Sequence, residues 1–214
     1  MRLYGFFRSS ASYRVRIALN LKGLAYDPSP VDLRLGDGAQ FSPAYRALNP
    51  QSLVPAMEDD GRVLTQSLAI LEYLEETHPL PPLLPPAAGD RARVRSLALI
   101  VACEIHPLNN TRVLRYLKER LGAGQETQDV WYRHWIDTGF SALEERLSRE
   151  RETGSFCHGD APGLADCCLI PQMANARRVR QDLTLFPTLL RIEKACLALD
   201  AFQRAAPERQ PDAG

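Results

Sequence analysis

This chain has neither an excess of charge of one sign nor a long apolar run. Its 214 residues carry 26 basic and 26 acidic side chains, so the formal net charge at pH 7 is zero. Because neither sign dominates, no overall field favours nucleic acid or an anionic membrane. The longest obvious apolar run, Leu97 to Cys103, is far too short to span a bilayer. We therefore expect no nucleic-acid partner and no membrane partner.

Cysteine is scarce and follows no recognisable spacing. The five cysteines are odd in number and form neither a C-x-x-C pair nor a Cys/His metal pattern, which argues against a disulfide framework and against a metal site. The apolar start of the chain is interrupted by arginines from Arg8 onward, unlike a secretory signal. We expect a reduced, metal-free, cytoplasmic protein.

A proline cluster separates two parts of the sequence. Five prolines fall between residues 79 and 86, where they interrupt helix and sheet alike. Before them short strand-like and helical segments alternate, and after them strand signals nearly vanish. The pattern predicts a small α/β domain at residues 1–79, a linker at 80–89 and an all-helical domain at 90–214.

Particular elements follow from local patterns. In the first part we expect strands at 2–7 and 24–33, a helix ended by Gly23, a loop at 36–40 and a short helix at 43–48. In the second part we expect helices at 91–121, with a bend at Pro107, and at 129–149, 164–179 and 187–205. Gly163 would cap the third of these helices with the help of Asp166. The polar tail from Pro207 is expected to be loose.

Residues 49–76 combine three backbone features in a short stretch. Asp59-Asp60-Gly61 between apolar runs predicts a hairpin, and Gln66-Ser67 opens a helix with Ser67 as its N-cap. Pro55 suits a strand edge or a cis bond in a tight turn. A helix N-terminus suits a carboxylate, although an ordinary hairpin and helix would have the same local pattern.

Two serines stand between the first strand and the first helix. The simplest interpretation of Ser9 and Ser10 is capping. Arg14 and Arg16 are less expected in the first turns, because cations there oppose the helix dipole. Their presence is consistent with an anion nearby.

These segments together resemble glutathione transferases. V-P at Val54-Pro55, then Q-S eleven residues after the proline and L-A-I-L-E-Y-L-E-E, resembles their glutathione site. F-R-S-S-A-S-Y-R-V-R-I-A-L-N-L-K-G resembles the zeta-class signature, in which S-S-C opens the first helix. The resemblance implies a thioredoxin-like α/β N-terminal domain, an all-α C-terminal domain and glutathione as cofactor.

The resemblance also assigns roles to residues. Ser9 would steady the glutathione thiolate with Ser10 beside it and Arg8 nearby as the third catalytic residue, while Ala11 stands where many zeta members have cysteine. The glutathione-binding residues it implies are Ser9, Ala11, Gln40, Val54, Pro55, Gln66, Ser67, Glu104, His106 and Asn110.

Substrate binding would fall to arginines, because a dicarboxylate needs fixed cations and arginine offers a planar fork. By resemblance these are Arg8, Arg112 and Arg178. Two of the residues singled out have plainer interpretations: His106 as a histidine packed at a helix kink beside Pro107, and Arg178 as a solvated residue at a helix C-terminus.

The implied activity is glutathione-dependent cis-trans isomerisation of maleylpyruvate to fumarylpyruvate, as in gentisate-type aromatic degradation, by reversible thiolate addition. Ala11 and His106 favour this substrate. The alternatives are maleylacetoacetate isomerisation in tyrosine breakdown and a zeta-class transferase acting on α-halo acids. A third, non-enzymatic possibility is a transferase-like interaction module. The implied partners are a small dicarboxylate and a second copy of the chain in a homodimer.

Overall fold

The structure, a computed structural model, describes residues 1–34 and 38–213. It divides into two compact units, the first formed by Met1–Leu83 with Leu197–Gly214 and the second by Leu84–Cys196. The sequence pattern predicts residues 197–214 in the helical domain, whereas the segment from Leu197 onward belongs to the first unit. The expected loop at 36–40 lies partly outside the described residues, at Gly36 and Asp37.

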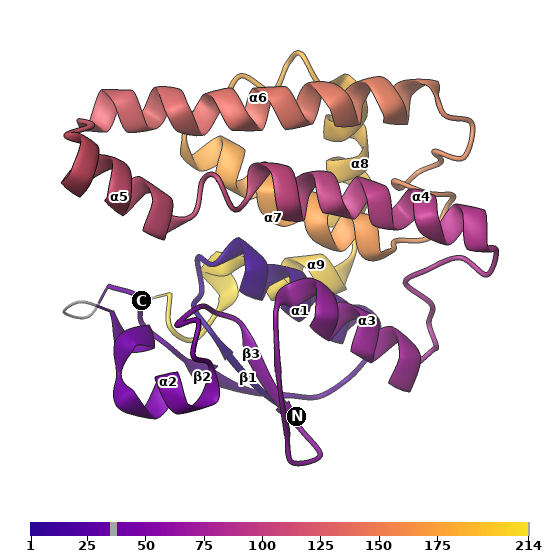
Figure 1. Cartoon of the computed structure of the whole chain (residues 1–214). Coiled ribbons are helices and arrows are strands. Elements are labelled where there is room, and N and C mark those ends of the chain that lie inside the picture. The colour runs from indigo at the N-terminus through magenta and orange to yellow at the C-terminus, as the bar shows by residue number, and fades with distance from the viewer. Residues whose placement is uncertain (35–37, 214) are drawn as a thin grey trace. The chain divides into compact units, whose positions relative to one another are not determined.

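The first unit contains a four-stranded sheet in the order β2-β1-β3-β4 (Figure 1). Strand β1 pairs parallel with β2 and antiparallel with β3, and β3 and β4 form the expected hairpin. The strands are β1 Arg2–Gly5, β2 Asp27–Pro30, β3 Ala56–Asp59 and β4 Arg62–Thr65. The helices with them are α1 Ser10–Leu21, the 3₁₀ turn Ala39–Phe41, α2 Pro43–Leu48 and α3 Ser67–Thr77.

Helix α1 is the centre of this unit. Val15, Ile17 and Leu19 have no exposed surface, and α1 packs against α3, whose Leu71 is equally buried. Strand β1 comes close to the same helix, because a Cβ on Gly5 would lie 3.1 Å from the Ser12 hydroxyl. The thioredoxin-like α/β prediction is therefore confirmed in its helices and its sheet.

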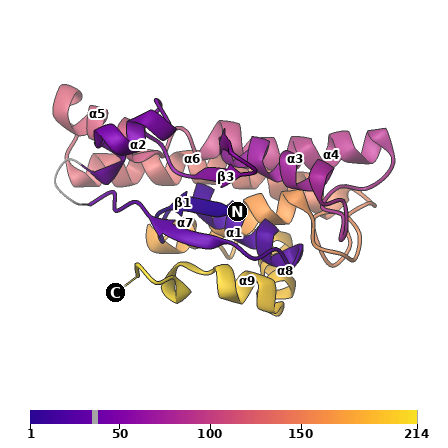
Figure 2. The ribbon, with the colours of Figure 1, turned by 90° about the horizontal axis from the view of Figure 1, so that it is seen from below.

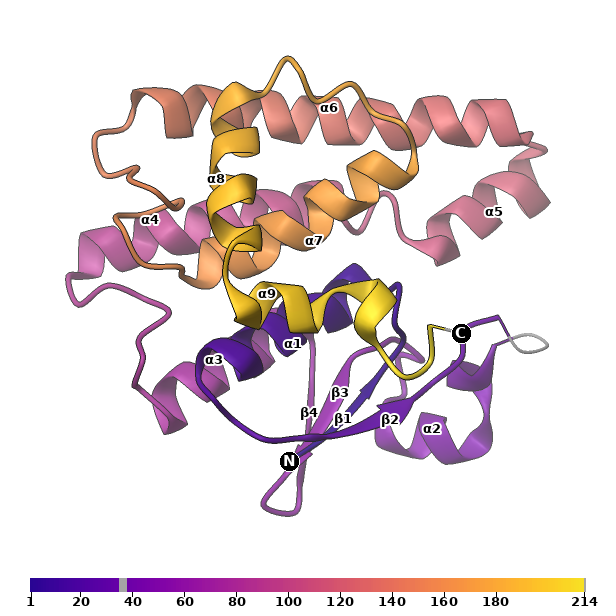
Figure 3. The same ribbon diagram turned by 180° about the vertical axis from the view of Figure 1, so that it is seen from behind.

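The C-terminal segment packs on the first unit. Helix α9, Asp200–Ala205, lies alongside α1 (Figure 3), and a 3₁₀ turn at Pro207–Arg209 follows it. Seen from below, α9 lies on the opposite side of β1 from α2 (Figure 2). The Gln210 side chain donates to the Arg204 and Ala206 carbonyls. The expectation of a loose tail was wrong, since these hydrogen bonds and one from the Phe7 N–H to Asp212 hold the segment.

The second unit is helical. Its elements are α4 Ala88–Leu99, a π-helical turn Ile100–Ile105, α5 Thr111–Leu121, α6 Gln125–Arg149, α7 Leu164–Arg178 and α8 Pro187–Leu197. In the described part of the chain, no helix has the length and apolar character needed to cross a membrane. Asp166 accepts from the Gly163 N–H at 2.8 Å, so the predicted start of α7 is confirmed.

Two of the predicted helices are interrupted. The helix expected at 91–121 changes to a π-helical turn after α4 and then ends before α5 begins at Thr111. Pro107 lies in the turn between them and has no N–H to continue the helical hydrogen bonds. Gly139 of α6 packs against this region, because a Cβ there would overlap the Ile105 side chain. The helix expected at 187–205 is split between α8 and α9, with Leu199 extended between them.

Candidate functional site

Strand register brings three segments to one end of the sheet. Tyr4 pairs with Ala56, so the chain that precedes β3 lies beside the end of β1. Ala56 pairs with Thr65, so the start of α3 reaches the same end. Because α1 also begins just after β1, two helix N-termini and the corner before β3 converge there.

The corner before β3 presents peptide groups at a bend in the chain. The Val54-Pro55 bond is cis. The Leu53 carbonyl accepts hydrogen bonds from the Tyr45 hydroxyl at 2.7 Å and from the Asn49 amide at 2.8 Å. Across residues 1–34 and 38–213 no partner is found for the N–H or C=O of Val54. Peptide groups without a partner of their own can pair backbone to backbone with a bound peptide.

Ser9 is the N-cap of α1. Its Oγ accepts from the Ser12 N–H at 3.2 Å. Because a hydroxyl has one donor in addition to its lone pairs, this capping bond leaves the Ser9 O–H able to donate to an anion. Capping and thiolate stabilisation are therefore compatible. The neighbouring Ser10 and Ala11 are buried in the first turn, and Arg8 is exposed.

The start of α3 differs in detail from the sequence-based prediction. Ser67 was expected to be the N-cap, but Gln66 holds that position and Ser67 is the first helical residue. The Ser67 Oγ instead accepts from the Arg14 Nη1 at 3.2 Å. Gln66 has a φ of 68°, a backbone conformation that costs about 1–3 kcal/mol and is typical of functional sites.

Gln40 brings a polar side chain into a buried position. It is 8% exposed, and its Oε1 has no partner in the part of the chain that the structure describes. Gly38 lies against it with a φ of 109°, and a Cβ there would overlap the Gln40 amide. A buried amide oxygen without a partner is costly, so a donor from a ligand would satisfy it.

These features fit glutathione. The Val54 backbone suits a peptide, the N-terminus of α3 with Ser67 suits a carboxylate, and the Ser9 hydroxyl suits a thiolate. The chain's own buried thiols are poor nucleophiles, because burial raises the pKa of Cys157 and of Cys196. Within the described residues no cluster of three or more His, Cys, Asp or Glu is arranged to hold a metal.

In the second unit, Arg178 is oriented by an aromatic partner. Its Nη2 donates to the Tyr132 hydroxyl at 3.1 Å, and its guanidinium carbon lies 5.5 Å from the ring centroid. Burial raises the pKa of Tyr132, and the nearby Arg178 opposes the rise. Arg178 is thus an exposed cation with a defined direction. No pattern in the sequence indicated Tyr132.

The other expected residues of this unit lie around the break between α4 and α5. Glu104 is exposed within the π-helical turn, and His106 follows it half-buried. Asn110 is the N-cap of α5, where its Oδ1 accepts from the Arg112 N–H at 3.1 Å. Arg112 is exposed in the first turn. π-Helical turns occur frequently at functional sites.

Helix α6 holds the turn that carries Asn110. The Trp131 indole donates to the Leu108 carbonyl at 2.9 Å, and the Asn109 amide donates to the Tyr132 carbonyl at 3.0 Å. These contacts fix the turn in addition to the helix cap at Asn110. Sequence reasoning did not single out Trp131 or Asn109.

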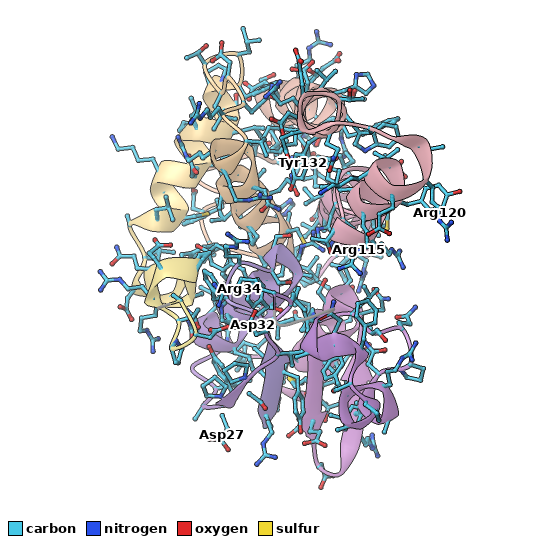
Figure 4. All side chains as sticks on the ribbon, turned by 90° about the vertical axis from the view of Figure 1, so that its left-hand side faces the viewer. Asp27, Asp32, Arg34, Arg115, Arg120 and Tyr132 are labelled. Carbon is cyan, nitrogen blue, oxygen red and sulfur yellow. The ribbon has the colours of Figure 1, made fainter. Side chains whose placement is uncertain are left out.

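A further arginine, close to the turn between β1 and α1, was not indicated by the sequence. Arg34 forms a bidentate pair with Asp32, with Nε–Oδ1 and Nη2–Oδ2 distances of 3.0 and 2.9 Å, and Figure 4 shows the two side chains together. Hydrogen bonds from Arg34 lower the pKa of Asp32. The guanidinium carbons of Arg34 and Arg8 lie 5.2 and 5.6 Å from the ring centroid of Phe7.

Comparison with known proteins agrees with this geometry. Residues 3–82 match the family model of the glutathione S-transferase N-terminal domain, which defines the class. A maleylpyruvate isomerase of Ralstonia sp. is 50% identical over 212 residues, 99% of both chains. The holo structure of a maleylpyruvate isomerase, described as a bacterial zeta-class glutathione S-transferase, has a TM-score of 0.97 and 49% identity over 100% of both chains.

A maleylacetoacetate isomerase of Methylobacterium extorquens AM1, solved with bound malonate and glutathione, has a TM-score of 0.96 and 50% identity over 100% of both chains. The chain belongs to this zeta-class glutathione transferase family, which includes the maleylpyruvate and maleylacetoacetate isomerases.

Proposed function

We propose that this protein is a glutathione-dependent cis-trans isomerase that converts maleylpyruvate to fumarylpyruvate. The single observation that carries the proposal is the convergence of the Ser9 hydroxyl, the Val54 peptide and the Ser67 end of α3 at one end of the sheet. Glutathione bound there supplies a thiolate, whose reversible addition to the double bond allows rotation.

The chain's own residues prepare that thiolate. A thiol with an ordinary pKa of about 8.5 is only a few per cent ionised at pH 7. Lowering this pKa by about two units corresponds to about 2.7 kcal/mol. The Ser9 O–H as a donor and the N-terminus of α1 together account for a stabilisation of that size.

Other residues orient the two ligands. The Val54 peptide would pair with the cysteinyl part of glutathione beside Pro55, and Gln66, Ser67 and Gln40 would hold its polar groups. Ser10 and Ala11 would line the corner, and Glu104, His106 and Asn110 complete the proposed glutathione-binding set.

The substrate's carboxylate and oxo oxygens would be held by Arg8, Arg112 and Arg178. Exposed guanidinium groups suit that role, because arginine binds a carboxylate through two parallel hydrogen bonds. Arg178 is the best oriented of the three, through its bond to the Tyr132 hydroxyl.

Substitution of Ser9 by Ala tests the central claim. We expect the pKa of the bound glutathione thiol to rise by about one unit and kcat/KM to fall about tenfold at pH 7, because one donor to the thiolate is lost. Ultraviolet titration of the complex measures the pKa. Ser148→Ala, an exposed serine of α6, is the control. An unchanged thiol pKa contradicts the proposal, and so does equal activity without added glutathione.

Maleylacetoacetate remains the competing substrate. The relatives named for the two substrates are 50% identical to this chain in both cases, so the preference rests on Ala11 and His106. Steady-state kcat/KM for both substrates with saturating glutathione decides between them, and an advantage for maleylacetoacetate reverses the assignment. Stoichiometric consumption of glutathione would instead indicate transfer, as with an α-halo acid.

We also propose that the chain forms a homodimer. Helix α5 has no buried residue, although it carries Tyr116 and Leu121 with 59% and 67% of their surface exposed. Burial of such side chains against a second copy is favourable. Light scattering after size exclusion is expected to give twice the mass of one chain, and a monomer at micromolar concentration contradicts the proposal.

The proposed location is the cytoplasm. Cys157 and Cys196 are buried free thiols and Cys103 is an exposed one, as expected of a protein folded in a reducing compartment. Detection of the protein in an exported fraction would overturn this assignment.

A further inference from the structure

The C-terminal segment reaches the loop that carries Ser9. Asp212 Oδ2 accepts a hydrogen bond from the Phe7 N–H at 2.9 Å. Phe7 lies two residues before Ser9, in the turn between β1 and α1. The same turn is closed by a hydrogen bond from the Ser9 N–H to the Phe6 carbonyl at 2.9 Å. The Asp212 carboxylate therefore contacts the turn that leads from β1 to Ser9.

The carbonyl of Phe7 is held from the other side by Arg16. The Nη2 of this arginine donates to the Phe7 carbonyl and its Nε donates to the Ala205 carbonyl, each at 2.9 Å. Arg16 is only 4% exposed. Burial lowers its pKa to about 10, so it remains charged at neutral pH. One buried guanidinium thus joins the Phe7 peptide to the last residue of α9.

The segment that carries Asp212 is itself docked on α1. Asn20 donates to the Ala201 carbonyl at 3.0 Å, and the Tyr13 hydroxyl donates to the Phe202 carbonyl at 3.5 Å. Phe202 has no exposed surface. Both polar groups of the Phe7 peptide are therefore fixed by the C-terminal segment, one directly through Asp212 and one through Arg16.

We propose that Asp212 is a positioning residue for the reaction, because its carboxylate holds the Phe7 peptide and thereby sets the direction of the Ser9 hydroxyl. The inference rests on the proposed role of Ser9. With only Arg8 between Phe7 and Ser9, a displacement of Phe7 is transmitted to the cap of α1. Small misplacements of a catalytic group cost large factors in rate, about a hundredfold for 1 Å.

The test compares Asp212→Ala with Asp200→Ala in the full chain. Asp200 is a matched control, because it lies on the same segment and pairs with Arg204 on the surface without contacting Phe7. Asp212→Ala is expected to raise the pKa of the bound glutathione thiol and to lower kcat/KM about tenfold, in keeping with the loss of a hydrogen bond to a charged acceptor. Asp200→Ala is expected to leave both unchanged. Asp212→Asn keeps an acceptor oxygen and is expected to recover part of the loss.

A double variant separates this inference from the proposed function. If Asp212 acts through Ser9, Asp212→Ala has no further effect on the thiol pKa in a Ser9→Ala protein. Additive effects overturn the positioning role. If the thiol pKa changes in Ser9→Ala but not in Asp212→Ala, the positioning role of Asp212 is overturned and the proposed function stands. An unchanged thiol pKa in Ser9→Ala instead removes the proposed role of Ser9.

A merely structural role for Asp212 makes a different prediction. It would lower the melting temperature and the amount of active protein without moving the thiol pKa of the folded fraction. That result also overturns the inference, and thermal unfolding of each variant detects it.

Discussion

Arg14 of α1 and Ser67, the first residue of α3, are joined by a hydrogen bond of 3.2 Å between Nη1 and Oγ. Both residues are buried, at 2% and 6% exposure. The bond connects the second turn of α1 to the first residue of α3, and the N-termini of both helices carry partial positive charge. A buried guanidinium placed beside two such ends makes this region attractive to an anion, which is the electrostatic basis of the proposed carboxylate site.

Substitution of Ser67 by Ala is expected to weaken glutathione binding. The variant loses a hydroxyl at the carboxylate site and removes an acceptor from a buried cation, so KM for glutathione should rise about tenfold, and stability should fall by about 1–3 kcal/mol. Steady-state kinetics and urea unfolding measure the two effects. Ser148→Ala serves again as the control. A wild-type KM for glutathione would place the carboxylate elsewhere.

Substitution of Tyr132 by Phe tests the orientation of Arg178. The ring contact is kept and only the 3.1 Å hydrogen bond is lost, so we expect KM for the dicarboxylate to rise about threefold to tenfold, as for one hydrogen bond. KM for glutathione should not change. Tyr73→Phe, which loses a hydroxyl hydrogen bond to Asp59 instead, is the matched control. Equal changes in both KM values would mean that Tyr132 does not act through Arg178.

Substitution of Gly139 by Ala tests the close packing of α6 on the π-helical turn. The added methyl would overlap the Cγ1 and Cδ1 of Ile105, which is fully buried. Overpacking of this kind costs about 1–3 kcal/mol. Chemical denaturation should show that loss, and Ile105→Ala should be less harmful in the Gly139→Ala background than alone. Independent, additive losses would show that the two residues do not compete for the same space.

Glu150 should make stability depend on pH. It accepts hydrogen bonds from Arg93 at 2.6 Å and from Arg146 at 2.7 Å. Burial raises its pKa, but the hydrogen bonds from both arginines lower it more, so the pKa falls below its ordinary 4.5. Because the folded-state pKa is the lower one, the stabilisation is present above pH 4.5 and is lost as the pH falls through the folded value.

The variant Glu150→Gln should therefore be less stable than the wild type by about 1–2 kcal/mol at pH 7, and the difference should be smaller at an acidic pH below 4.5. Urea midpoints at both pH values measure it. Glu145→Gln removes an exposed pair with Arg149 and should have little effect at either pH. A pH-independent difference between Glu150→Gln and the wild type would contradict the assignment.

Local sequence patterns were sufficient for much of the first unit. Asp60-Gly61 between apolar runs specifies the hairpin, because both residues adopt positive φ values of 46° and 72°. Pro43 begins α2 and Gly23 follows α1, as proline and glycine usually do at helix ends. The motifs around Ser9, Val54 and Ser67 by themselves resemble a glutathione site.

What the sequence by itself determined here is the local chemistry: a turn, a cap, a proline corner and the residue types that glutathione requires. These depend on neighbours a few positions apart, so a linear pattern contains them. Only the tertiary structure decided that Ser67 accepts from Arg14 instead of capping α3, that Tyr132 directs Arg178, and that Asp212 holds Phe7. Each of these is a contact between residues far apart in the chain, whose geometry depends on how whole helices pack.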